Sequence, residues 1–199
     1  MRKGEKTKAH IIMKSAELFN QKGYAGTTMQ DIIEATGLTK GGLYRSFTNK
    51  DEIALEAFKY AGNLLSEHFS AAIQGKETAI EKISAMGEVY SDAVHNPPLI
   101  GGCPFLITAV ESDHASPFLR DQTLAIYELT LSLIQSILKQ GIADKELRVD
   151  MDTESVASFC FSAIEGGILV SRLTRDNKHV AYAIKNIELL LLTFKHEKD

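Results

Sequence analysis

The chain has 199 residues, 44% of them hydrophobic and 24% charged, which is the composition of an ordinary globular protein long enough to form one domain or two. Its two cysteines, Cys103 and Cys160, are too few for a disulfide framework and suit a reducing compartment. No apolar run approaches the roughly 20 residues that span a bilayer, and no hydrophobic region follows the basic N-terminus, so we expect a cytoplasmic protein without a membrane span or secretory signal.

The formal net charge of −4 averages two unlike parts of the chain. Residues 1–50 hold nine Lys or Arg residues against four Asp or Glu, a net charge of +5, whereas the remaining residues carry −9. This asymmetry predicts a polyanionic partner at the N-terminal end and argues against a nucleic acid that wraps the rest of the chain.

Apolar residues recur at helical spacing in almost every segment, and no segment shows the sustained alternation of a half-buried strand. The sequence therefore predicts an all-α fold of about nine helices. The first helix is expected at about residues 7–22, with Gly23 as its stop. Thr28 is expected to cap the second helix, with Asp31 as a weaker form of the capping box, and Gly37 to end it.

The later helices are predicted largely from their caps. Asn49, with Glu52 three residues on, opens the fourth helix, and Asp152 and Asn177 cap the eighth and ninth. Proline after Ser116 marks the first turn of the seventh helix. The third and the fifth to ninth helices are expected at about Lys40–Phe47, Thr78–His95, Cys103–His114, Ser116–Gly141, Thr153–Arg175 and Lys178–Lys195.

The last two predicted helices are apolar around more of their circumference than packing on one core requires. A helix that is hydrophobic on two sides needs two partners, so these helices are the candidates for a subunit interface. Gly166 and Gly167 remove side chains where another backbone is able to approach. The candidate interface residues are Phe159, Ala163, Gly167, Val170, Ile187 and Leu191.

The segment from Thr28 to Phe47 has the features of a helix-turn-helix: a helix, a tight glycine turn and a second short helix. Leu43 and Phe47 lie one turn apart in the short helix and are expected to pack inward on Ile32 and Ala35. The inner face of the segment is therefore predicted to join a small hydrophobic core.

The outer face of the short helix is polar and cationic, with Lys40, Tyr44 and Arg45 pointing outward. Thr39 is placed to cap this helix or to reach a base or a phosphate, since N-terminal residues of a recognition helix meet base edges. Lys50, at the start of the following helix, is expected to hold a phosphate with help from the positive end of that helix.

Gly41 and Gly42 also favour DNA binding. They would weaken an isolated helix, yet they let the backbone come close to DNA. The alternative, a helical hairpin within an all-α core, does not account for the coincidence of the spacing, the glycine turn, the exposed cations and the local charge of +5.

The segment resembles the N-terminal region of the TetR family of bacterial regulators over about residues 8–56. The matching residues are Thr28, Ile32, Ala35, Gly37, Leu38, Thr39, Gly41, Leu43, Tyr44, Phe47, Lys50 and Asp51. The resemblance implies a homodimer on a double-stranded DNA operator, a recognition helix in the major groove and a C-terminal domain that binds an inducer. It divides the chain into a DNA-binding domain, residues 1–50, and an effector-binding and dimerisation domain, residues 51–199.

The same resemblance implies roles for single residues at the DNA. Thr28, Tyr44 and Lys50 would contact phosphates, while Thr39, Lys40 and Gly42 would lie near base edges. Arg45 stands where the family frequently has histidine, so its role as a base reader or a phosphate clamp stays open.

An effector pocket is likewise expected from the resemblance. The candidate lining residues are Phe58, Met86, Tyr90, Cys103, Phe105, Glu111, Tyr127 and Phe161. For any one of the aromatic residues or Met86, packing in the core is the simpler explanation, and for Glu111 it is an exposed helix end. A mostly apolar or aromatic small molecule is the expected effector, and the acidic body disfavours a strongly anionic one.

Cys103 provides an alternative mode of sensing. The segment around it resembles a subgroup of the family with a Gly-Cys pair at the start of the sixth helix, which includes sensors of electrophiles or oxidants, and a helix N-terminus lowers the pKa of a thiol. Cys160 is expected to be inert packing. Glu111 and His114 have the i, i+3 spacing of two metal ligands with Asp113 nearby, but two ligands are not a site, so we expect no metal.

Other classes of protein find less support in the sequence. No nucleophile elbow, phosphate-binding glycine loop, HExxH motif or paired-carboxylate pattern is present, so we expect neither an enzyme nor a cofactor. An enzyme that uses the apolar pocket, and a helical adaptor that has lost DNA binding, remain alternatives. The expected function is that of a ligand-responsive regulator, a dimeric repressor that binds a palindromic operator and is released by an effector; activation in place of repression stays an open alternative.

Overall fold

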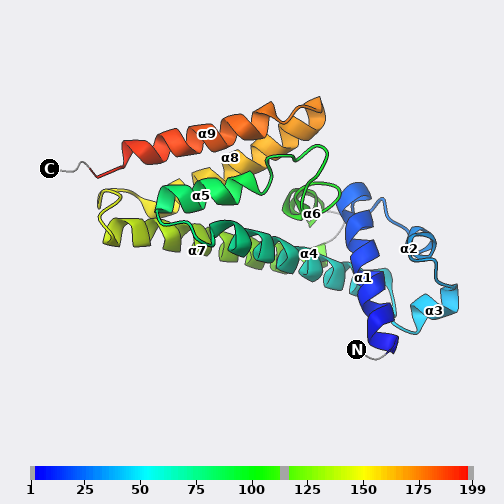
Figure 1. Ribbon diagram of the computed structural model, residues 1–199. Coiled ribbons are helices and arrows are strands. Elements are labelled where there is room, and N and C mark those ends of the chain that lie inside the picture. The colour runs from blue at the N-terminus through cyan, green and yellow to red at the C-terminus, as the bar shows by residue number, and fades with distance from the viewer. Residues whose placement is uncertain (1–2, 113–116, 197–199) are drawn as a thin grey trace. The chain divides into compact units, whose positions relative to one another are not determined.

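The computed structural model describes residues 3–112 and 117–196. Within these ranges the chain forms nine α-helices and one short 3-10 helix, and the one β contact is an isolated bridge between Leu147 and Lys195, which confirms the all-α prediction. The helices are α1 Lys3–Lys22, α2 Met29–Thr36, α3 Lys40–Tyr44, α4 Lys50–Ile73, α5 Ala79–Glu88, α6 Pro104–Ser112, the 3-10 helix Pro117–Leu119, α7 Arg120–Ala143, α8 Thr153–Thr174 and α9 Lys178–Thr193 (Figure 1).

The chain divides into two compact units. Unit 1 comprises Met1–Leu65 and Leu99–Leu124, and unit 2 comprises Ser66–Pro98 and Ala125–Asp199. Two of the three boundaries fall within α4 and within α7, and the third lies between Pro98 and Leu99. The segment that contains α6 belongs to unit 1 together with α1, α2 and α3. The compact unit that contains the N-terminal helices is therefore larger than the first 50 residues. The functional division at residue 50 stays a prediction.

Local capping fixes several helix ends where the sequence places them. The Thr28 hydroxyl accepts a hydrogen bond from the Asp31 backbone N–H, and the Asp31 carboxylate accepts one from the Thr28 backbone N–H, so the capping box of α2 is complete. Asn49 Oδ1 accepts from the Glu52 backbone N–H at 2.9 Å at the start of α4. Asp152 accepts from two backbone N–H groups at the start of α8.

Several helix ends differ from the prediction: α1 begins at Lys3, four residues before the expected start, and α7 begins at Arg120, after the short 3-10 helix. Helix α3 ends at Tyr44, three residues earlier than expected, and α5 ends at Glu88 because the chain turns before Asn96. Asn177 does not cap α9; its side chain instead binds Asp92 at 2.6 Å and the backbone N–H of Val94 at 3.1 Å. The predicted cap Ser116, and with it Asp113 and His114, lies outside the described residues.

Each unit has its own hydrophobic core. In unit 1 the core is formed by Ile11, Ile32, Leu43, Phe47 and Ile53, all at most 2% exposed. Full burial of such a side chain contributes roughly 1.5–3 kcal/mol, as an upper estimate. The larger core of unit 2 is formed by residues of α5, α7, α8 and α9, among them Met86, Leu138, Ala157, Ile187 and Leu191.

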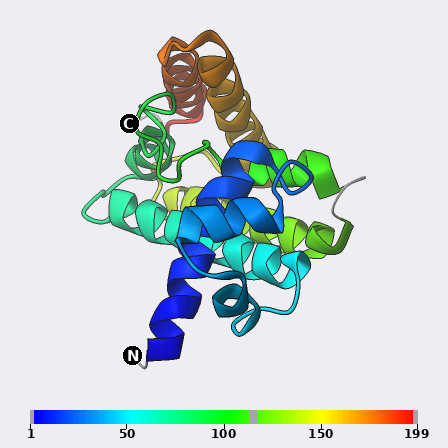
Figure 2. The ribbon, with the colours of Figure 1, turned by 90° about the vertical axis from the view of Figure 1, so that its right-hand side faces the viewer.

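Helices α8 and α9 lie side by side in unit 2, as both views of the molecule show (Figures 1 and 2). Gly167 makes this approach possible, because a methyl group there would lie 2.9 Å from Val180 Cα. By length and composition alone, α8 would be able to cross a membrane, but its buried side packs on α9 and the unit 2 core.

Candidate nucleic-acid interface

A glycine turn joins α2 to α3. Gly37 has φ +66°, a left-handed conformation that favours glycine, and its N–H donates to Glu34 O at the end of α2. Two residues later, the Thr39 hydroxyl accepts from the Gly42 backbone N–H at 3.1 Å and so caps α3. The turn and both of its caps are thus specified by residues within the segment itself.

The inner face of the helix-turn-helix is the one predicted, with one exception. Leu43 and Phe47 are buried with Ile32 in the unit 1 core. Ala35 is exposed, so the expectation that it receives Leu43 and Phe47 was wrong. The buried stripe of α2 instead runs four residues on from Ile32 to Thr36, whose hydroxyl donates to Ile32 O at 2.7 Å and so satisfies its polarity.

The outer face of α3 is formed by exposed polar and cationic groups: Thr39, Lys40, Gly41, Tyr44 and Arg45. A methyl group on Gly41 would have no neighbouring atom within 4 Å. Gly42 is half-buried, and a methyl group there would lie 3.3 Å from Thr39 Oγ1. The backbone of α3 at Gly41 is therefore directly accessible to a large partner, and cations lie on both sides of it.

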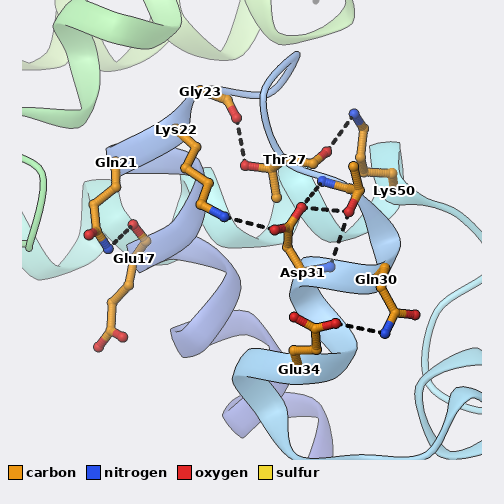
Figure 3. Close-up of polar contacts among 10 residues, drawn as sticks. Glu17, Gln21, Lys22, Gly23, Thr27, Gln30, Asp31, Glu34 and Lys50 are labelled. Carbon is orange, nitrogen blue, oxygen red and sulfur yellow. Dashed lines mark hydrogen bonds and ion pairs between the residues drawn. The ribbon is translucent and has the colours of Figure 1, made fainter.

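Thr28 is held at the positive end of α2. Asp31, its capping partner, also forms an ion pair with Lys22 of α1 at 2.7 Å (Figure 3). The hydrogen bonds from Lys22 and Thr28 hold the pKa of Asp31 well below its usual range, so this carboxylate stays ionised. The start of α2, where a phosphate would meet free N–H groups, is thereby fixed to the end of α1.

Lys50 has a structural role that the sequence did not reveal. Its Nζ donates to Thr27 O at 3.0 Å (Figure 3). It also donates to Tyr24 O at 2.9 Å and lies 3.9 Å from the centre of the Tyr24 ring. Two of the three N–H donors of the ammonium group therefore hold the loop between α1 and α2, the segment Gly23–Thr28. Any phosphate contact by Lys50 starts from this fixed position.

The same loop is bound by a second residue of α4, Asp51, and by a residue of α6, Glu111. The Tyr24 hydroxyl donates to Asp51, and burial together with this carboxylate raises the pKa of Tyr24 to about 12. Glu111 of α6 accepts from the Tyr24 N–H at 2.6 Å and from the Ala25 N–H at 3.2 Å. The sequence predicts Glu111 only as an effector-binding residue, a role that stays a prediction; its contact with Tyr24 has no local signal, because 87 residues separate the two.

The candidate effector residues are divided between the two units. In unit 1, Cys103 is buried, Phe105 is half-buried, and Phe58 and Glu111 line a cavity of about 30 Å³. In unit 2, Met86 and Tyr90 are buried, and Phe161 packs on the core and contacts the Tyr127 ring, with 5.2 Å between ring centres. Their role in effector binding stays a prediction.

A cavity of about 900 Å³ lies in unit 2, between α4, α5, α9 and residues 96–98. None of the predicted effector residues lines it. Its walls combine small apolar side chains with charged and polar ones, including His68, Lys76, Ser84, Glu88, Asn96 and Glu188. This volume is within the range of ordinary small-molecule sites, roughly 300–1,000 Å³.

Three of the predicted interface residues face their own subunit. Gly167 packs against α9, and Ile187 and Leu191 lie in the unit 2 core, 2% and 0% exposed, while Ala163 is half-buried beside them. Helical periodicity alone does not distinguish which of the two apolar sides of α8 or α9 packs on the core. The exposed apolar residues, which we call the α8–α9 apolar face, are Phe159, Leu169, Val170 and Leu173 of α8 and Tyr182, Leu189 and Leu192 of α9.

The fold and this surface define a helix-turn-helix DNA-binding protein. Residues 11–57 match the family model described as bacterial regulatory proteins, tetR family, and residues 79–187 match that of the tetracyclin repressor-like C-terminal domain. The chain therefore belongs to the TetR family and is a helix-turn-helix transcriptional regulator, as the sequence predicts.

Similar proteins are known from several bacteria. A TetR transcriptional regulator from Chloroflexus aurantiacus has a TM-score of 0.94 and 34% identity, with 100% of both chains covered. One from Cytophaga hutchinsonii has a TM-score of 0.92 and 32% identity over 100% of this chain and 99% of that one. The HTH-type transcriptional repressor DhaR from a Mycobacterium species is 27% identical over 85% of this chain and 84% of its own.

Proposed function

We propose that this regulator is a dimeric repressor that binds a palindromic operator through α3. The observation that carries the proposal is the outer face of α3, where exposed Lys40, Gly41, Tyr44 and Arg45 stand on a helix anchored by buried Leu43. The local charge of +5 supports DNA as the partner, and the relative DhaR is named a repressor. Such a protein acts in the cytoplasm, where the DNA is.

The α8–α9 apolar face supports dimerisation. Seven large apolar side chains on two adjacent helices, each at least 37% exposed, are unusual for a monomer. Gly166 lies on the same side of α8, and a methyl group there would meet no atom within 4 Å, so a second helix has room to approach. A twofold dimer would present two α3 helices to successive major grooves, about one helical turn apart.

Release from DNA follows if an effector prefers the form of the dimer that fits the operator poorly, because equal affinity for both forms shifts nothing. A small, mostly apolar effector remains the proposal. Cys103 offers a second route, as a sensor of electrophiles; this residue is only 5% exposed, so a reagent needs a local opening to reach its thiol. If a reactive quinone abolishes DNA binding by the native protein but not by Cys103→Ser, this second route is supported.

Hydroxyl-radical footprinting on the DNA upstream of this protein's own coding region tests the proposal. We expect two protected patches related by twofold symmetry and centred about 10 base pairs, or a multiple of that, apart. Protection that is absent or spread evenly along the fragment would contradict it.

A further inference from the structure

Helix α6 binds the loop before α2 through one carboxylate. Glu111 accepts hydrogen bonds from two successive backbone N–H groups, those of Tyr24 and Ala25, at 2.6 and 3.2 Å. Gly23 makes room for it: this glycine has φ +74°, and a methyl group there would lie 2.5 Å from Glu111 Oε1. The contact thus depends on two residues: Glu111, whose carboxylate accepts the hydrogen bonds, and Gly23, whose lack of a side chain leaves room for that carboxylate.

The loop that receives this carboxylate is compact. The Thr27 hydroxyl, fully buried, donates to Gly23 O at 2.7 Å, and a methyl group on Gly26 would lie 2.3 Å from Lys22 O (Figure 3 shows the Thr27 contact). A segment closed on itself in this way has little freedom to absorb a displacement. Movement of the Tyr24 and Ala25 amides is therefore passed on to Thr27.

At its other end the loop meets two of the predicted phosphate ligands. The Lys50 ammonium group is held by the carbonyl groups of Tyr24 and Thr27, and Thr28, the next residue, is the N-cap of α2. The carboxylate of α6 thus accepts from the N–H of the Tyr24–Ala25 peptide group, whose carbonyl oxygen accepts from Lys50. Asn20 ties the start of α6 to α1 as well, by donating to Ile100 O and Gly102 O at 3.0 and 2.9 Å.

We infer that Glu111 is a positioning residue for DNA binding: by fixing the loop Gly23–Thr28, it places the Lys50 ammonium group, and with it the N-terminus of α2, for contact with operator phosphates. This inference rests on the proposed function. It also gives α6 a direct route to the DNA-binding surface, through a contact that lies within unit 1.

The test is the salt dependence of operator binding, which counts phosphate contacts, since each contact contributes about 0.9 to the slope of log K against log salt. In a dimer, the loss of the Lys50 contact from both DNA-binding domains lowers the slope by about 2. We expect Glu111→Ala and Lys50→Met each to show this decrease, and the double variant to fall no further than Lys50→Met. Additive decreases, or an unchanged slope in Glu111→Ala, would overturn the inference.

Glu146 provides a matched control. Its carboxylate accepts from two successive N–H groups of α5, those of Ala79 and Ile80, at 2.6 and 3.2 Å, in unit 2. Glu146→Ala removes a contact of the same kind and should leave the slope unchanged. A decrease there equal to that of Glu111→Ala would mean that general destabilisation is responsible, and would also overturn the inference.

Glu111→Gln keeps one acceptor oxygen, so it provides a second variant for the test if Glu111→Ala fails to fold. Its slope should lie between those of the native protein and Lys50→Met, and a slope equal to the native one counts against the inference. If the native protein itself shows no operator preference, the proposed function fails first, so the two failures are distinguishable.

Discussion

Lys50 Nζ donates a hydrogen bond to the carbonyl oxygen of Thr27 at 3.0 Å, which fixes the start of α4 to the residue that precedes the N-cap of α2. A cation in this position serves two purposes in the proposed complex. It stabilises the loop between α1 and α2 in the free protein, and it lies at the positive ends of two helices, where a phosphate is favoured.

Lys50→Ala should therefore weaken binding to all DNA sequences by a similar factor, about tenfold or more, since a hydrogen bond to a charged group contributes roughly 1.5–3 kcal/mol. Lys40→Ala removes an exposed cation of α3 and should instead change which bases are preferred. Competition binding to a set of operator variants separates the two effects. An unchanged sequence preference in Lys40→Ala would argue against base contact by this residue.

Gly41→Ala should fold well and bind poorly. The added methyl group meets no atom in the free protein, and alanine favours a helix by about 1 kcal/mol over glycine, so thermal stability should rise slightly. Operator affinity should nevertheless fall if the backbone of α3 approaches DNA. Gly37→Ala is the contrasting variant: its φ of +66° costs an alanine about 1–2 kcal/mol, so stability itself should fall. If Gly41→Ala binds the operator as tightly as the native protein does, DNA does not approach the backbone of α3 at Gly41.

Leu169→Glu, or Leu189→Glu, should convert the protein to a monomer of 21.9 kDa, because each places a charge within the α8–α9 apolar face. Leu129→Glu is a suitable control, since Leu129 is 71% exposed on α7 and lies outside that face. Analytical ultracentrifugation measures the masses. If Leu169→Glu stays dimeric while Leu129→Glu dissociates, the interface has been assigned to the wrong helices.

Asp31 should make the stability of the protein sensitive to acid. Because Lys22 and Thr28 lower its pKa in the folded state, Asp31 stabilises the fold above the unfolded pKa of about 3.9, and this contribution is lost as the pH falls through the lower folded value. Asp31→Asn removes the charge and keeps an acceptor for the Thr28 N–H. The difference in Tm between the two proteins should be present at neutral pH and shrink below about pH 4. An equal difference in Tm at both pH values would mean that the charge is unimportant.

The features that the sequence predicted correctly are those decided by neighbours along the chain. The cap at Thr28 depends on Asp31, the cap at Asn49 on Glu52, and the inward packing of Leu43 and Phe47 on helical periodicity. Each of these relationships lies within one turn, where spacing and side-chain chemistry alone determine the outcome.

The features that it did not predict depend on partners far along the chain. Glu111 and Tyr24 are 87 residues apart, so no local pattern related them. Asparagine commonly caps helices, but the Asn177 side chain binds Asp92, 85 residues away. Ile187 and Leu191 lie on an apolar helix with two suitable sides, and only the tertiary structure decides that their side is the one that meets the core.

The most direct test of the account is the affinity of the purified protein for its own upstream DNA relative to a shuffled fragment of equal length, at moderate salt. We expect binding to the upstream DNA to be tighter by about 10³-fold or more, as for specific regulators. Equal affinity for the two fragments would contradict the assignment of the α3 surface to operator recognition.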